Sequence, residues 1–148
     1  MTSSVDSPTN APTVPGGPWT LEVIMLPVSD VDRAKDFYAR VGFTADHDHV
    51  VPAGSPGNAG DTDIRFVQMT PPGSGCSITF GVGLVEGEPG SVKGLMMCVT
   101  DIEAVRTHLL DAGIDVSEVA IEPWGHFVYF ADPDGNAWSV QYLPYRHG

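Results

Sequence analysis

The chain carries one sequence pattern twice, and this repeat constrains its fold more than any single motif does. Val28–Val31 opens a stretch that closes at Val41–Phe43, and Val99–Ile102 opens a stretch that closes at Ala112–Ile114. The two stretches align without a gap. Such self-similarity predicts two copies of one structural module.

A second matched pair of segments follows the first in the same order. Arg65–Met69 precedes the turn Pro71–Gly73, and His126–Phe130 precedes the turn Asp132–Gly135. In each half, one stretch has apolar residues at helical spacing, and short apolar runs bounded by Gly or Pro are typical of strands. Each module is therefore predicted to contain a strand, a helix and three strands.

We expect an α+β protein of two tandem βαβββ modules in a single domain over residues 19–144. Module one covers about residues 19–85, and module two covers about residues 92–143. Residues 1–18 are rich in Ser, Thr, Pro and Gly and lack the apolar block of a secretion signal, so we expect a disordered tail there. Two half-sheets built alike can close around a cavity, so the function is expected to lie between them.

The helix boundaries follow from capping residues. Ser29 or Asp30 caps the first helix and Gly42 ends it, whereas Thr100 opens the second helix as part of a capping box and Gly113 ends it. The predicted strands are 21–26, 44–51, 65–70, 76–82, 94–99, 116–121, 127–131 and 137–142.

Composition excludes several classes of function. A net charge of −12 with only seven Lys and Arg residues argues against nucleic acid and anionic membranes, because binding a phosphate backbone depends on Lys and Arg. No stretch approaches the roughly 20 apolar residues of a membrane span. Cys76 and Cys98 each lie in an apolar run, which predicts two buried free thiols in a reducing cytoplasm.

These features together resemble the vicinal oxygen chelate superfamily, which includes glyoxalase I, the bleomycin-resistance proteins, the fosfomycin-resistance enzymes and the extradiol dioxygenases. The resemblance covers residues 20–143 and rests on the repeated module, on Phe37-Tyr38 ahead of Gly42-Phe43, and on Asp132–Asn136. It implies two curled, mixed sheets that form a cup. In the enzymes of this superfamily, His and Glu residues from four strands hold a divalent metal in that cup.

The resemblance places the four metal-ligand positions on Val23, Thr79, Gly94 and Ser139. None of these is His, Asp or Glu, whereas divalent metals need several such donors. We therefore predict that the metal site is absent and that the protein has no cofactor.

The expected ligand-binding face follows from these positions, because residues two apart on a strand share a face. The resemblance to fosfomycin-resistance enzymes adds Tyr129 to this face, and we expect Trp124 at the rim of the cup. The predicted ligand-binding residues are Val23, Met25, Phe66, Gln68, Ser77, Thr79, Gly94, Met96, Cys98, Trp124, Phe127, Tyr129, Ser139 and Gln141. The set is mostly apolar without charge, which is typical of a pocket for a neutral or aromatic compound; the alternative is that these residues fill the sheets as core.

Three hypotheses of function remain open. The first is a metal-free, cytoplasmic, homodimeric protein that encloses a small organic molecule, similar to the bleomycin-resistance type. The second is a metal-independent isomerase, lyase or cyclase in which Tyr129 and Gln68, with His126 as a further candidate, act on a carbonyl. The third is a metal-dependent glyoxalase or dioxygenase with displaced ligands, for which the candidates are Glu22, His47, His49 and Glu122.

Overall fold

Each half of the chain folds into four strands and one helix, in the order that the repeat predicts. The computed structural model describes residues 15–144, so most of the predicted tail lies outside the described residues. Module one contains β1 (Val23–Met25), α1 (Val31–Val41), β2 (Thr44–Val51), β3 (Ile64–Thr70) and β4 (Ser77–Val82). Module two contains β5 (Leu95–Cys98), α2 (Ile102–Asp111), β6 (Ala120–Glu122), β7 (Gly125–Ala131) and β8 (Ala137–Tyr142).

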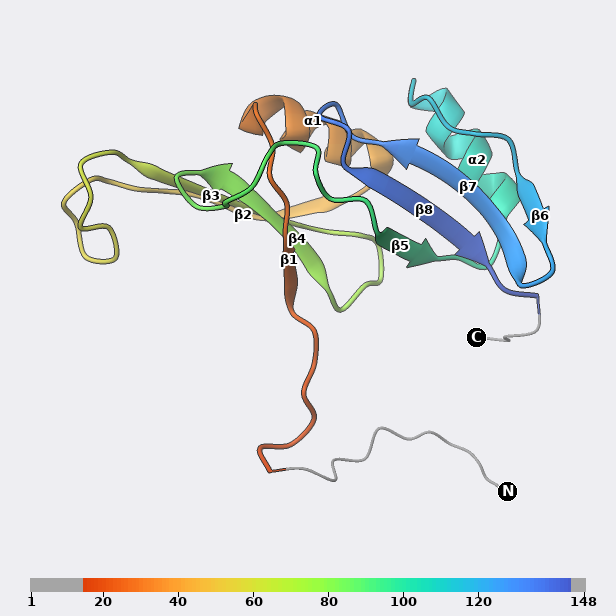
Figure 1. Ribbon diagram of the computed structural model, residues 1–148, viewed down its shortest axis with the longest axis horizontal. Coiled ribbons are helices and arrows are strands. Elements are labelled where there is room, and N and C mark those ends of the chain that lie inside the picture. The colour runs from red at the N-terminus through yellow and green to blue at the C-terminus, as the bar shows by residue number, and fades with distance from the viewer. Residues whose placement is uncertain (1–14, 145–148) are drawn as a thin grey trace.

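The strands form two mixed sheets with the same topology, which confirms the predicted fold class (Figure 1). Sheet one has the strand order β1-β4-β3-β2, and sheet two has the order β5-β8-β7-β6. The first strand of each module runs parallel to the last, and the other pairs are antiparallel. Both sheets are open, so β1 and β5 are edge strands.

The helix ends follow the sequence closely, with one correction. Asp30 caps α1, and Gly42, which has a φ of 125°, ends it as predicted. The cap of α2 is Asp101, not Thr100, because the Asp101 carboxylate accepts a hydrogen bond from the backbone N–H of Ala104 at 3.0 Å. A carboxylate at this position also interacts favourably with the positive end of the helix dipole.

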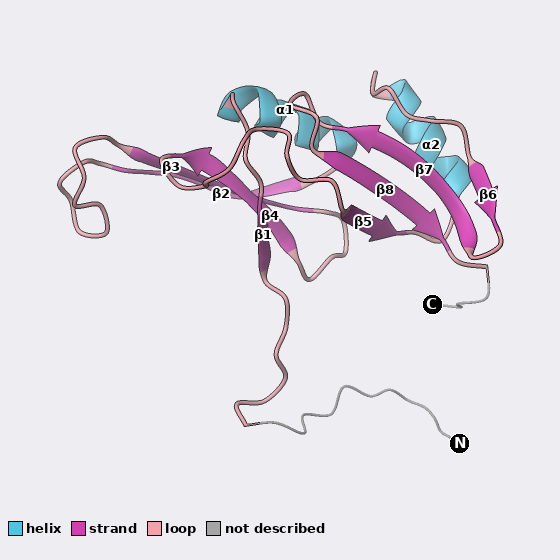
Figure 2. Cartoon of the chain, in the orientation of Figure 1, coloured by secondary structure: helices cyan, strands magenta, loops and turns pink. Residues whose placement is uncertain are grey.

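One face of each sheet packs against a helix, and we call the opposite face the open face. In sheet one, Val67, Met69, Ile78 and Phe80 are buried on the helix side. In sheet two, Val128, Phe130, Trp138 and Val140 are buried. Figure 2 shows the two sheets side by side with α1 near the junction between them.

Helix α1 joins the two modules into one core, because its aromatic residues contact both sheets. The Tyr38 ring lies 6.1 Å from Phe80 of sheet one and 5.9 Å from Trp138 of sheet two. The Phe37 ring lies 6.1 Å from Phe130 of sheet two. Each such buried aromatic side chain contributes about 1.5–3 kcal/mol relative to exposure.

A buried hydrogen-bond network at this junction explains the Asp132–Asn136 motif. The Tyr38 hydroxyl donates to Asp132 Oδ2 at 2.8 Å and accepts from Trp138 Nε1 at 2.9 Å. The other carboxylate oxygen of Asp132 accepts hydrogen bonds from backbone N–H groups of its own turn. Asn136 donates to the carbonyl of Pro27 in module one at 2.9 Å. The motif therefore closes a turn in module two and holds module one against it.

The predicted strand over 116–121 is wrong in its extent, since β6 covers only Ala120–Glu122. Ser117 explains the difference. Its hydroxyl accepts a hydrogen bond from the backbone N–H of Tyr129, and its own N–H donates to the Tyr129 carbonyl. A side chain thus replaces the regular backbone ladder at this point.

Both cysteines are free within the described residues, but the expectation that they are buried is wrong. Cys76 is half-buried, and Cys98 is exposed because it ends the edge strand β5. Within residues 15–144, no helix is long and apolar enough to cross a membrane.

Candidate ligand-binding site

The open face of sheet one gathers the side chains that strand alternation predicts. Met25, Thr79 and Gln68 lie opposite one another in successive strands, and the row continues to His47 on β2. Val23 pairs with Ser77 in the neighbouring row, on the same face. The buried Thr79 hydroxyl has no hydrogen-bond partner among the described residues.

The open face of sheet one also carries His47 and His49, the two histidines that the third hypothesis names as displaced metal ligands. His49 lies opposite Phe66 in the next row. The His47 ring is 5.5 Å from the His49 ring and 6.2 Å from the Phe66 ring. Both histidines are exposed, so these three rings form a tilted aromatic surface that a ligand can contact.

The open face of sheet two carries a flat aromatic pair. Met96, Ser139 and Tyr129 lie opposite one another in one row. In the next row, Cys98 and Gln141 lie opposite Phe127. The Phe127 and Tyr129 rings have centroids 6.2 Å apart and an interplanar angle of 8°.

A hollow of about 570 Å³ lies over this face, and we call it the sheet-two hollow. Its lining residues are Lys93, Asp115, Ser117, Tyr129, Phe130, Ala131, Ala137, Trp138 and Ser139. Tyr129 and Ser139 belong to the predicted set. Lys93 and Asp115 do not, because they come from segments without secondary structure before β5 and after α2, where no periodic pattern shows which face a side chain will meet. The predicted site without charge is therefore bordered by one side chain of each sign.

Two further predicted residues lie away from this hollow. His126 is on the helix side of β7, opposite Ile121 and Tyr142, and its ring is 5.5 Å from the Tyr142 ring. It therefore points to the other side of the sheet from Tyr129. Trp124 is 61% exposed in the turn between β6 and β7.

The positions that correspond to the superfamily's metal ligands do not fit a divalent metal. Val23, Thr79 and Ser139 lie on the open faces, and Gly94 lies just before β5. They supply two hydroxyl groups and neither an imidazole nor a carboxylate. Among residues 15–144, no three His, Cys, Asp or Glu side chains gather where they could hold a metal ion.

The main ion-pair cluster belongs to the helix side of sheet one. Asp48 accepts hydrogen bonds from Arg65 at 2.9 Å and from Lys35 at 2.8 Å, and Arg65 also donates to Asp32 of α1 at 2.9 Å. The hydrogen bonds from Arg65 and Lys35 hold the pKa of Asp48 well below its usual range. This cluster links α1 to the sheet, and it holds the Arg65 side chain on the face opposite the open face.

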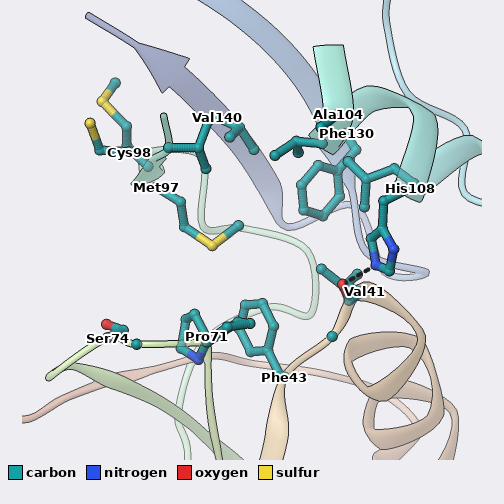
Figure 3. Close-up of a pocket in the computed structure, with 17 residues that line it drawn as sticks. Val41, Phe43, Pro71, Ser74, Met97, Cys98, Ala104, His108, Phe130 and Val140 are labelled. Atoms are coloured by element: carbon teal, nitrogen blue, oxygen red, sulfur yellow. Dashed lines mark hydrogen bonds between the residues drawn. The ribbon is translucent and has the colours of Figure 1, made fainter. Parts of the chain in front are cut away.

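A second cavity, of about 680 Å³, lies between the modules, and we call it the intermodule pocket (Figure 3). Module one contributes the segment Val41–Phe43 and the turn Pro71–Ser74 to its lining. Its lining residues from module two are Met96, Met97, Cys98, Val99, Ala104, Val105, His108, Leu109, Phe130 and Val140. The repeat led us to expect a cavity between the modules, and Met96 and Cys98 of the predicted set line this one; its other lining residues were not predicted, because strand alternation says nothing of turns and helices.

Comparison with family models identifies the chain over most of its length. Residues 20–140 match the Glyoxalase/Bleomycin resistance protein/Dioxygenase superfamily. None of the curated proteins compared with the sequence matches it.

Solved structures agree with this family. TnmS3, an antibiotic binding protein from Streptomyces sp. CB03234, is 32% identical and superposes with a TM-score of 0.70 over 84% of this chain and 96% of its own. A glyoxalase/bleomycin resistance protein from the same strain is also 32% identical, with a TM-score of 0.67 over 82% of this chain and 99% of its own. A superfamily member from Sphaerobacter thermophilus DSM 20745 is 26% identical, with a TM-score of 0.64 over 84% and 97% of the two chains. The chain therefore belongs to the Glyoxalase/Bleomycin resistance protein/Dioxygenase superfamily.

Proposed function

We propose that this protein binds a small, largely aromatic organic molecule on its open faces without a metal ion. The observation that carries the proposal is the Tyr129 ring, which is 47% exposed, lines the sheet-two hollow beside Ser139 and stacks on the buried Phe127. Flat aromatic surfaces favour flat aromatic ligands, since stacking adds about 0.5–1.5 kcal/mol to the burial of area. The similarity to TnmS3, described as an antibiotic binding protein, supports a drug-like or natural-product ligand.

Neutral hydrogen-bonding groups lie around this pair and would orient the ligand. Ser139 lies opposite Tyr129, and Gln141 lies opposite Phe127 on the same face. A hollow of about 570 Å³ falls within the range of roughly 300–1,000 Å³ that small-molecule sites occupy. Five of its nine lining residues have polar side chains that could orient a ligand, namely Lys93, Asp115, Ser117, Tyr129 and Ser139.

We further propose that the protein acts as a cytoplasmic homodimer in which the open faces of two chains enclose the ligand. Met25 on edge strand β1 is 48% exposed, and Met96 on edge strand β5 is 54% exposed. Trp19 and Leu21 are 78% and 70% exposed in the segment that extends away from both sheets (Figure 1). Exposed apolar side chains in this number on a small domain support a protein partner, and a two-fold dimer is the commonest assembly.

Equilibrium dialysis against a broad panel of aromatic natural products, with EDTA present, tests the proposal. We expect at least one compound to bind at micromolar concentration, and Tyr129→Ala to weaken that binding. His126→Ala is the matched control, because His126 lies on the same strand but on the opposite face. An absence of binders across the panel, or binding that survives only without the chelator, contradicts the proposal.

A further inference from the structure

We propose that the intermodule pocket is a second binding site, apart from the sheet-two hollow, and that it takes a neutral aromatic compound. The pocket lies on the helix side of sheet two, where Phe130 and Val140 face α2. Tyr129 and Ser139, the neighbours of these residues in β7 and β8, point to the open face. Met96 and Cys98 of edge strand β5 also line the pocket, so the pocket reaches the open face along this edge, but it shares neither Tyr129 nor Ser139 with the sheet-two hollow.

The lining of the pocket selects against charge. None of its side chains is Lys, Arg, Asp or Glu. Its two best polar side chains already have partners in the protein: the His108 ring is 2.8 Å from the Val41 carbonyl, and the Ser74 hydroxyl donates to the Cys76 carbonyl at 2.9 Å. An ionic ligand would lose its hydration here without gaining a counter-charge, so the pocket favours a neutral molecule.

Two walls from different modules define the shape of the ligand. Figure 3 shows Phe43 and Pro71 of module one on one side, and Met97 and Phe130 of module two on the other. The Met97 side chain extends into the space between them. A thioether makes favourable contacts with aromatic rings. Together with the two phenyl rings, it favours an aromatic ligand over an aliphatic one of the same size.

The volume fits such a ligand as a whole rather than a single inserted side chain. About 680 Å³ is in the middle of the range of roughly 300–1,000 Å³ for small-molecule sites. Of the two exposed methionines that we assign to the contact with a second copy, Met25 does not line the pocket, whereas Met96 is one of its lining residues. Because the volume fits a whole small molecule, we commit to that occupant rather than to a segment of a second chain.

The experiment uses the full-length protein with 13C-labelled methionine methyl groups and N-phenyl-1-naphthylamine, a neutral aromatic probe. Met97 reports on the pocket, Met25 reports on the open face of sheet one, and the buried Met69 reports on folding. Two variants fill the pocket from opposite walls, Ala104→Trp on α2 and Ser74→Trp on the β3–β4 turn. Thr107→Trp is the matched control, because Thr107 is exposed on α2 and does not line the pocket.

We expect the probe to shift the Met97 signal saturably, and each pocket-filling variant to weaken this titration at least tenfold while the Met69 signal stays native. Thr107→Trp should change the affinity measured by this titration less than twofold. Three results would overturn the proposal: probe-induced shifts confined to Met25, a Met97 titration that both pocket-filling variants leave unchanged, or no saturation of Met97 at the solubility limit of the probe. None of these results bears on ligand binding at Tyr129, so the two proposals fail separately.

Discussion

The hydroxyl of Tyr38 in module one donates a hydrogen bond to the carboxylate of Asp132 in module two at 2.8 Å. The residues are 94 positions apart in the chain, and both are buried. The same hydroxyl accepts a hydrogen bond from Trp138. This pair fixes how the modules meet, and with it the shape of the intermodule pocket.

Tyr38→Phe should destabilise the protein by roughly 2–3 kcal/mol, because buried groups of Asp132 and Trp138 lose a partner at once. The free energy of unfolding in urea measures the effect. Tyr142→Phe is the control, since its ring packs at the edge of the core against His126. Equal losses in the two variants would show that the network does not join the modules as we describe.

The same network predicts how stability depends on pH at the alkaline end. Burial raises the pKa of Tyr38 above its usual value, and the nearby charge of Asp132 raises it further. A tyrosine whose pKa is raised in the folded state makes its full contribution to stability at pH values below the pKa of about 10 that it has in the unfolded chain. This contribution is lost as the pH rises above that value. Wild-type stability should therefore fall by an extra amount of about 1.4 kcal/mol per pH unit above pH 10. In Tyr38→Phe, a decline of the same steepness would contradict this origin.

The sequence predicted the fold and the open faces well because both depend on periodic patterns. The repeat indicated two βαβββ modules, and alternation correctly placed Met25 with Thr79 and Tyr129 with Ser139 on shared faces. Because side chains along a strand alternate between the two faces of the sheet, the face of each residue can be predicted even where the ends of the strand are uncertain. The predicted cap of α2 was wrong by one residue, because Thr100 and Asp101 are both residue types that cap helices well.

The parts that the sequence did not predict depend on tertiary contacts. Lys93 and Asp115 reach the sheet-two hollow from irregular segments. His47 and His49 are exposed, but their position beside Phe66 follows from the pairing of β2 with β3, which is not visible in local sequence. The repeat indicated a cavity between the modules, but most residues that line the intermodule pocket come from turns and from the helix side of sheet two, which no local pattern indicates.

Substitutions at Tyr129 separate binding from catalysis. If the ring acts as a stacking surface, Tyr129→Ala should weaken the best binder of an aromatic panel by roughly tenfold, while Tyr129→Phe should change its Kd by less than about threefold. Calorimetric titration of both variants measures this. A product that forms from the bound compound, and that Tyr129→Phe abolishes without changing Kd, would instead support the metal-independent enzyme.

Metal removal should leave binding unchanged. Because the residues at the superfamily's metal positions offer only the hydroxyls of Thr79 and Ser139, protein purified without chelators should contain far less than one divalent ion per chain by elemental analysis. Dialysis against EDTA should not alter ligand affinity. Stoichiometric metal would point to displaced ligands such as Glu22, His47, His49 or Glu122.

Dimerisation should depend on the exposed edges of the open faces. We expect wild-type protein to sediment as a dimer, and Met25→Arg to shift it toward monomer by at least tenfold in Kd, because a buried charge there would have no partner. Leu110→Arg is the control, since Leu110 is exposed to a similar extent, 45%, but lies on α2. A monomeric wild type, or equal effects of both variants, would contradict the assembly that we propose.

The most direct test is a crystal structure of the protein with its tightest aromatic binder, with anomalous scattering data to locate metal ions. We predict that the compound lies over sheet two in contact with Tyr129 and Ser139, with no metal ion between it and the protein. A metal ion held by side chains on an open face and bridging to the compound would contradict the account, as would an open face that stays empty when the compound is bound elsewhere.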